Sequence, residues 1–198
     1  HEFGHAFTGV RLGARFEHVI VVPTPDAGGY VKPNGHGSYA IDMVASLYMF
    51  LGSRAFERIV FSPNPMSPES VLRISSGPSR DIQMATVTLY NMLYELGMNP
   101  NGGTVDRNFS TGMGKYASYV DMPNELAEKL GQILRELETE IVRETLAEHS
   151  REWYIEKIVE LARAGSMTEK EFYELVGRKL PENNHRSVGS INEHFRSL

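Results

Sequence analysis

Apolar residues recur every three or four positions along most of this chain, a spacing that predicts α-helices. The longest such stretch, Ser38 to Phe61, is apolar around most of its circumference, so we expect a long and mostly buried helix. Another helix is predicted from Ser79, with Gly97 as its stop. The serine- and proline-rich segment Ser62 to Pro78 is expected to be a loop.

The second half of the chain continues the helical pattern. The spacing of leucine and isoleucine predicts an acidic amphipathic helix from Leu126 to about His149, and another around Trp153 to Leu161. Residues Thr168 to Glu171 have the order of a capping box, which predicts a last short helix. We expect the glycine- and asparagine-rich residues 99–118 to form a loop, and residues 181–198 to be a flexible tail.

The composition of β-strands is confined to one region near the start. Phe16 to Val22 is rich in β-branched residues, and Gly28 to Val31 suggests a second short strand. His1 to Gly9 has helical spacing, with His1 and His5 one turn apart. We therefore predict a mainly α-helical fold in which a small pair of strands lies beside this first helix.

Composition narrows the possible functions. The chain has 198 residues, a formal net charge of −5 and no stripe of lysine or arginine, which argues against nucleic-acid binding. It has no cysteine, so any metal must be held by histidine and carboxylate side chains. No apolar stretch approaches the roughly 20 residues of a membrane span, and we expect the chain itself to be soluble. It begins with His1 rather than methionine, so we expect that an upstream part, including the start of the first helix, is missing.

The first five residues, His1-Glu2-Phe3-Gly4-His5, form an H-E-x-x-H motif. The spacing of four brings both imidazoles onto one helix face with Glu2 beside them. Zinc held by such a pair and a third protein ligand keeps an open position for water. We therefore predict a zinc peptidase in which His1 and His5 bind the metal and Glu2 is the general base.

The third ligand is not settled by spacing. A metzincin would need glycine and histidine where this chain has Thr8 and Arg11, so that class is excluded. Glu57, on the long predicted helix, and Asp81, in the first turn of the next, both remain candidates.

Further along the chain, Ser76 to Thr86 (SGPSRDIQMAT) resembles the T-G-A-x-N-D-[IL]-x-x-A-T segment of the FtsH-type metalloproteases. Leu47 to Phe61 (LYMFLGSRAFERIVF) resembles the L-G-G-R-x-A-E-E helix of that family, Gly97-Met98 its G-M ending, and Gly4 to Gly9 its G-H-A-x-x-G continuation. These motifs follow the order of the family between His1 and Met98.

The resemblance implies that Asp81 is the third zinc ligand and that Glu57 is a structural or supporting carboxylate. It implies a zinc endopeptidase domain that acts on unfolded or extended polypeptides, with residues 1–122 as the zinc-binding catalytic core and residues 123–180 as a C-terminal helical part. It also implies that substrate adds as a strand along an edge strand, here His18 to Val22, although an ordinary core strand is the alternative interpretation.

This chain departs from the family pattern at six positions, none of which is a predicted ligand or the base. Two of the departures are arginines that call supporting hydrogen bonds near the metal into question. The six residues are Phe3, Ser53, Phe56, Arg58, Pro78 and Arg80.

FtsH-type enzymes combine the protease with an ATPase module and usually a membrane anchor, and they work as hexamers. The resemblance thus implies polypeptide substrates, a homo-oligomer, a possible upstream ATPase, and a bacterial membrane-associated location facing the cytoplasm, or an organellar one. This chain carries no G-x-x-x-x-G-K-[ST] loop. We therefore expect the ATPase module and the anchor to be either upstream or absent. A stand-alone zinc peptidase, which the divergent Arg58 and Arg80 favour, and an inactive, protease-derived assembly module, against which the intact ligands and base argue, are the alternative interpretations.

Overall fold

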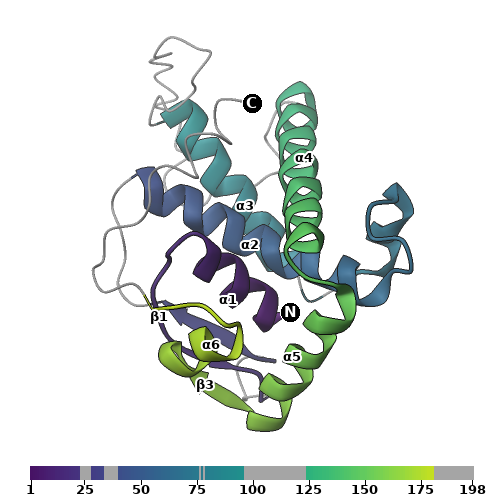
Figure 1. Cartoon of the computed structure of the whole chain (residues 1–198). Helices are drawn as coiled ribbons and strands as arrows, with labels where there is room; N and C mark the ends of the chain where they lie inside the picture. The colour runs from purple at the N-terminus through teal and green to yellow at the C-terminus, as the bar shows by residue number, and fades with distance from the viewer. Residues whose placement is uncertain (23–27, 34–39, 76, 78, 96–123, 181–198) are drawn as a thin grey trace.

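Helices dominate the structure (Figure 1), as the apolar spacing predicts. The computed structural model describes residues 1–22, 28–33, 40–75, 77, 79–95 and 124–180. Helix α1 lies between the long helix α2 and a small sheet, while α3 and α4 cover the other side of α2. The helices are α1 (Glu2–Arg11), α2 (Ala40–Phe61), α3 (Ser79–Tyr90), α4 (Asn124–Glu148), α5 (Arg151–Ala164) and α6 (Glu169–Leu175).

The packing of α1 on α2 depends on two glycines. A Cβ atom added to Gly4 would lie 2.6 Å from the carbonyl oxygen of Gly52, and one added to Gly52 would lie 2.8 Å from the carbonyl oxygen of Gly4 and overlap the Thr8 hydroxyl. Because real Cβ atoms do not approach other atoms so closely, the two backbones can touch only while both residues lack side chains. This contact holds the start of α1 against the middle of α2.

An aromatic core joins α1 to the C-terminal helices. Phe3 lies against Phe56 of α2 and Phe172 of α6, with ring centroids 5.4 and 5.3 Å apart. Phe7 and Phe56 both meet Tyr154 of α5 edge-on. Phe3 and Phe56 are two of the departures from the family pattern, and they fill space against each other, so the two large side chains are accommodated together.

A second core lies between α2, α3 and α4 and is built from aliphatic side chains such as Leu51, Leu89 and Leu137. Both cores include residues from before and after the predicted boundary at residue 122. The division into residues 1–122, 123–180 and 181–198 stays a prediction, and residues 181–198 and the predicted loop 99–118 lie outside the described residues.

The sheet has the strand order β2-β1-β3 and is antiparallel throughout. Strand β1 (Phe16–Ile20) pairs with β2 (Tyr30–Pro33) on one side, as predicted, and with β3 (Ser166–Thr168) on the other. Val19, for example, is opposite Val31 on one side and Met167 on the other. The prediction that His18 to Val22 forms a free edge strand is therefore wrong, because β3 occupies that edge.

Two further elements differ from the sequence-based expectation. The predicted loop between α2 and α3 contains a 3-10 helix, η1 (Pro68–Arg73), whose first turn is capped by the Ser67 hydroxyl accepting the Glu69 N–H. Helix α3 ends at Tyr90 and continues as a π-helical turn, η2 (Asn91–Glu95), before the predicted stop at Gly97, which lies outside the described residues. Within the described ranges, none of the helices is long and apolar enough to cross a bilayer.

We predict that Gly52→Ala lowers the free energy of unfolding by about 1–3 kcal/mol or more, because the new methyl group would force α1 away from α2. Gly131→Ala is the matched control in α4, where an added Cβ meets only the flexible Arg135 side chain at 3.6 Å. Gly131→Ala should stabilise the protein by about 0.5–1 kcal/mol through helix propensity. Urea unfolding of both variants measures the difference, and equal stabilities would contradict the close contact.

Candidate metal centre

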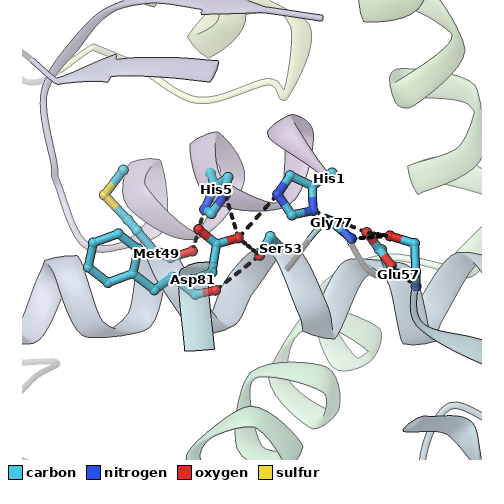
Figure 2. Close-up of polar contacts among 9 residues, drawn as sticks. His1, His5, Met49, Ser53, Glu57, Gly77 and Asp81 are labelled. Atoms are coloured by element: carbon cyan, nitrogen blue, oxygen red, sulfur yellow. Dashed lines mark hydrogen bonds and ion pairs between the residues drawn. The ribbon is translucent and has the colours of Figure 1, made fainter. Parts of the chain in front are cut away.

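Three helices meet at the N-terminal end of α1 (Figure 2). His1, which caps α1, and His5 face the middle of α2, and Asp81 reaches them from the first turn of α3. The structure brings together the three residues that were predicted as metal ligands: one ligand atom from each lies within 4.8 Å of the others. Among the described residues, no other group of three histidine, aspartate or glutamate side chains has this arrangement.

The two imidazoles point the same nitrogen at one carboxylate oxygen. Nε2 of His1 lies 3.1 Å from Oδ2 of Asp81, and Nε2 of His5 lies 3.3 Å from the same atom. The rings are perpendicular, with centroids 4.9 Å apart. All three side chains are partly buried, with exposed fractions of 27%, 12% and 16%. The cluster is thus accessible from solvent but sheltered.

The other nitrogen of each ring is held by α2. Nδ1 of His5 lies 2.7 Å from the Met49 carbonyl oxygen, and Nδ1 of His1 lies 3.1 Å from Oε1 of Glu57. A carbonyl oxygen can only accept, so Nδ1 of His5 carries the proton. Glu57 also accepts the Ser75 N–H at 2.6 Å and the Ser75 hydroxyl at 3.0 Å. Glu57 therefore contacts the side of His1 that faces away from Asp81, as expected for a supporting carboxylate.

The donor set fits a divalent cation. When the imidazoles are neutral and carry their proton on Nδ1, each presents a lone pair on Nε2, and both lone pairs point at the Asp81 carboxylate. Three acceptors can converge in this way only around a cation or a proton. Two nitrogens and one oxygen are ligands that zinc accepts in open, catalytic sites. The arrangement could therefore hold zinc through His1, His5 and Asp81.

The same convergence changes the pKa values of the cluster. Burial alone would raise the pKa of Asp81, but hydrogen bonds from His1 and His5 in their protonated, metal-free state, and from Ser53, outweigh it and lower the pKa well below the usual range of a carboxyl. Burial lowers the pKa of His1, but the hydrogen bond to Asp81 and the negative charges around it prevail, and the pKa is raised. The cluster thus favours positive charge at its centre.

Glu2 lies beside the cluster in a space that Gly29 leaves open, a role that the sequence did not reveal. A Cβ atom added to Gly29, just before β2, would lie 2.7 Å from Cγ and 3.0 Å from Oε1 of Glu2. Burial raises the pKa of Glu2, while the nearby His5 and His1 partly offset this rise. A carboxylate with a raised pKa is a better proton acceptor near neutral pH.

The sequence gives little sign of the other residues of the centre. The Met49 carbonyl is backbone, and its contribution depends only on where α2 crosses α1. Ser53 donates to Asp81 at 3.0 Å and Ser75 to Glu57, although serine is common on any helix or loop. One available signal was the spacing of Met49, Ser53 and Glu57, which places them one turn apart on a single face.

The two arginine departures do not enter the centre. Arg58 is buried and points to the other side of α2, where it donates to Glu138 of α4 at 3.1 Å, to the Ser70 hydroxyl at 2.8 Å and to the Pro65 carbonyl at 2.9 Å. Arg80 is exposed at the start of α3. Neither arginine alters the hydrogen bonds described above.

Comparison with known proteins identifies relatives of this chain. Residues 1–174 match Peptidase family M41. The chain is 32% identical over 108 residues to the "ATP-dependent zinc metalloprotease FtsH" of Mesomycoplasma conjunctivae and, over the same length, to that of Mycoplasmopsis synoviae. Each alignment covers 52% of this chain, but only 13% and 15% of the respective relative. An "ATP-dependent zinc metalloprotease FtsH 2" of Thermoanaerobacter sp. is 32% identical over 110 residues, 53% of this chain and 20% of that protein. The chain matches a fifth or less of these relatives.

We predict that Asp81→Ala loses zinc, because it removes one of three converging ligand atoms. Glu57→Gln should keep zinc and weaken its binding by about 10–100-fold at most, since glutamine can still accept from Nδ1 of His1. Metal analysis after dialysis, followed by titration against a chromophoric chelator, measures both effects. The assignment of the third ligand would be wrong if Glu57→Gln lost the metal while Asp81→Ala retained it.

Proposed function

The chain belongs to peptidase family M41, and on this basis we propose that it is a zinc-dependent endopeptidase domain that cleaves extended polypeptides. The observation that carries the proposal is the convergence of Nε2 of His1, Nε2 of His5 and Oδ2 of Asp81. A merely structural cluster of two histidines and an aspartate would not need Nδ1 of each ring fixed by a separate acceptor on α2.

In this proposal His1, His5 and Asp81 hold the zinc. When bound, zinc polarises the carbonyl of the bond to be cut and lowers the pKa of a water molecule towards about 7. Glu57 and the Met49 carbonyl keep the proton on Nδ1 of His1 and His5, so that both Nε2 atoms stay available. The ligands and the groups that orient them are thus residues that already contact one another.

Glu2 is the general base. Its carboxylate accepts the proton of the attacking water and returns it to the nitrogen of the leaving amine, so the residue is ionised at the start and the end of each cycle. Partial burial supports this role, because it raises the pKa of Glu2 and makes it a stronger proton acceptor. Gly29 leaves the space in which the side chain of Glu2 lies.

The substrate in this proposal is an extended segment of polypeptide that adds to the outer edge of β2. Strand β1 has partners on both sides, whereas β2 is the end strand of the described sheet. Gly29, the residue just before β2, lies beside Glu2. Backbone hydrogen bonds to this edge would hold a substrate largely irrespective of its side chains.

The full activity we propose is that of a protease module working with an ATPase module in a homo-oligomer. The names of the relatives give their zinc proteolysis as ATP-dependent, and the homo-oligomer follows from the family resemblance. An extended segment is available only when a folded substrate opens, which costs about 5–15 kcal/mol for a typical domain. A motor that pulls on the substrate would supply this free energy. The hexamer and the membrane-associated location stay predictions from the resemblance.

We predict that Glu2→Gln keeps zinc but loses about 10²–10⁴-fold in the hydrolysis of an unfolded protein, because glutamine cannot accept the proton. Glu17→Gln, which changes an exposed glutamate on β1, is the control and should be as active as the parent. Initial rates at matched zinc content decide the matter. A Glu2→Gln variant within about tenfold of the parent would exclude Glu2 as the base.

Gly29→Ala should also lower the rate of hydrolysis, because its methyl group would crowd the Ile20 carbonyl and displace the Glu2 side chain, while zinc content stays unchanged. Gly28→Ala provides a matched control, since a Cβ atom there meets nothing within 4 Å. Rates and metal content of the two variants are compared with the parent. If Gly29→Ala is as active as Gly28→Ala, the position of Glu2 in the structure is not the active one.

A further inference from the structure

Ser53 contacts the ligand cluster through Asp81, although the family pattern has glycine at this position. Its side chain is fully buried in the middle of α2, one turn from both Met49 and Glu57. The hydroxyl oxygen lies 3.0 Å from Oδ2 of Asp81 and 3.0 Å from the Phe50 carbonyl oxygen (Figure 2). Ser53 therefore adds to the site a donor that the family pattern does not contain.

The two neighbours compete for a single proton, because both are acceptors and a hydroxyl has only one hydrogen. The Phe50 carbonyl is part of α2 and already accepts the N–H of the next helical turn. Asp81 is ionised, and a hydrogen bond to a carboxylate is stronger than one to a neutral carbonyl. The Ser53 hydroxyl therefore donates its hydrogen bond mainly to Asp81.

The importance of this bond increases when a metal binds. Without metal, Oδ2 of Asp81 also faces Nε2 of His1 and of His5, which can donate to it while the imidazoles are protonated. Once both Nε2 atoms bind a cation, neither can donate to the carboxylate. Among the described side chains, Ser53 is then the one that still donates a hydrogen bond to Asp81.

We propose that Ser53 is a positioning residue of the metal centre, which holds the carboxylate of Asp81 with Oδ2 directed at the two histidines. This inference rests on the proposed zinc site and deepens it, because it assigns a function to a side chain that the resemblance leaves unexplained. Without the hydroxyl, the carboxylate of Asp81 could rotate about its Cβ–Cγ bond. Metal binding would then have to restrict this rotation, and the entropy cost would lower the affinity for the metal.

The test compares zinc affinities in Ser53→Ala and Ser53→Gly with that of the parent protein, by competition with a chromophoric chelator. Ser70→Ala is the matched control: Ser70 is also buried, and its hydroxyl accepts from Arg58 and donates to the Pro65 carbonyl, remote from the centre. Thermal unfolding of each metal-free variant separates loss of stability from loss of affinity.

We expect the dissociation constant for zinc to rise about 10–100-fold in both Ser53 variants and to stay within twofold of the parent in Ser70→Ala, even though Ser70→Ala lowers the melting temperature. Parent-like zinc affinity in Ser53→Ala would overturn the inference, as would an equal loss in Ser70→Ala. A failure of the zinc site itself gives a different result: the parent protein would not bind zinc, or Asp81→Ala would bind it as tightly as the parent.

Discussion

The close contact between Gly4 and Gly52 is the constraint on which the centre depends. It allows the backbones of α1 and α2 to touch, so that the short imidazole side chains of His1 and His5 reach acceptors on α2. Both helices repeat every 3.6 residues, and the two histidines are therefore spaced like Met49, Ser53 and Glu57 on the facing helix. One helix supplies the ligands, and the other fixes their orientation. Asp81 needs only to arrive from the third helix to complete the cluster.

Three departures from the family pattern, Phe3, Phe56 and Arg58, leave this arrangement intact because their side chains make their contacts away from the ligands. Phe3 and Phe56 enlarge the aromatic core below the site, where they contact each other. Arg58 forms a buried ion pair with Glu138 that connects α2 to α4. Its guanidinium also donates hydrogen bonds to the Ser70 hydroxyl and the Pro65 carbonyl. A buried pair of this kind adds little net stability but is costly to break on one side. Among the departures that the structure describes, Ser53 is the one with a hydrogen bond to a proposed ligand.

Local patterns predicted most of the fold and part of the centre. The helices followed from apolar spacing, and the pairing of His1 with His5 followed from a spacing of four, since both signals arise within a few turns of one helix. Asp81 lies 76 positions beyond His5 in the chain (81 − 5 = 76), and its placement depends on how α3 crosses α2, so the residues alone left Glu57 open as an alternative. Strand β3 is three residues long, too short for any periodicity, and it is a strand only because β1 lies beside it. Gly29, Ser53 and Ser75 act through contacts with distant residues, which no local pattern encodes.

The central claim is that His1, His5 and Asp81 together form a zinc site whose imidazoles are oriented by α2. A crystal structure of the zinc-loaded protein, with anomalous scattering recorded at the zinc absorption edge, tests this claim most directly. We expect one strong anomalous peak at about 2.0–2.2 Å from Nε2 of His1, Nε2 of His5 and a carboxylate oxygen of Asp81. Glu57 should remain on Nδ1 of His1. A peak coordinated by Glu57 in place of Asp81, or no peak between the two histidines, would contradict the account.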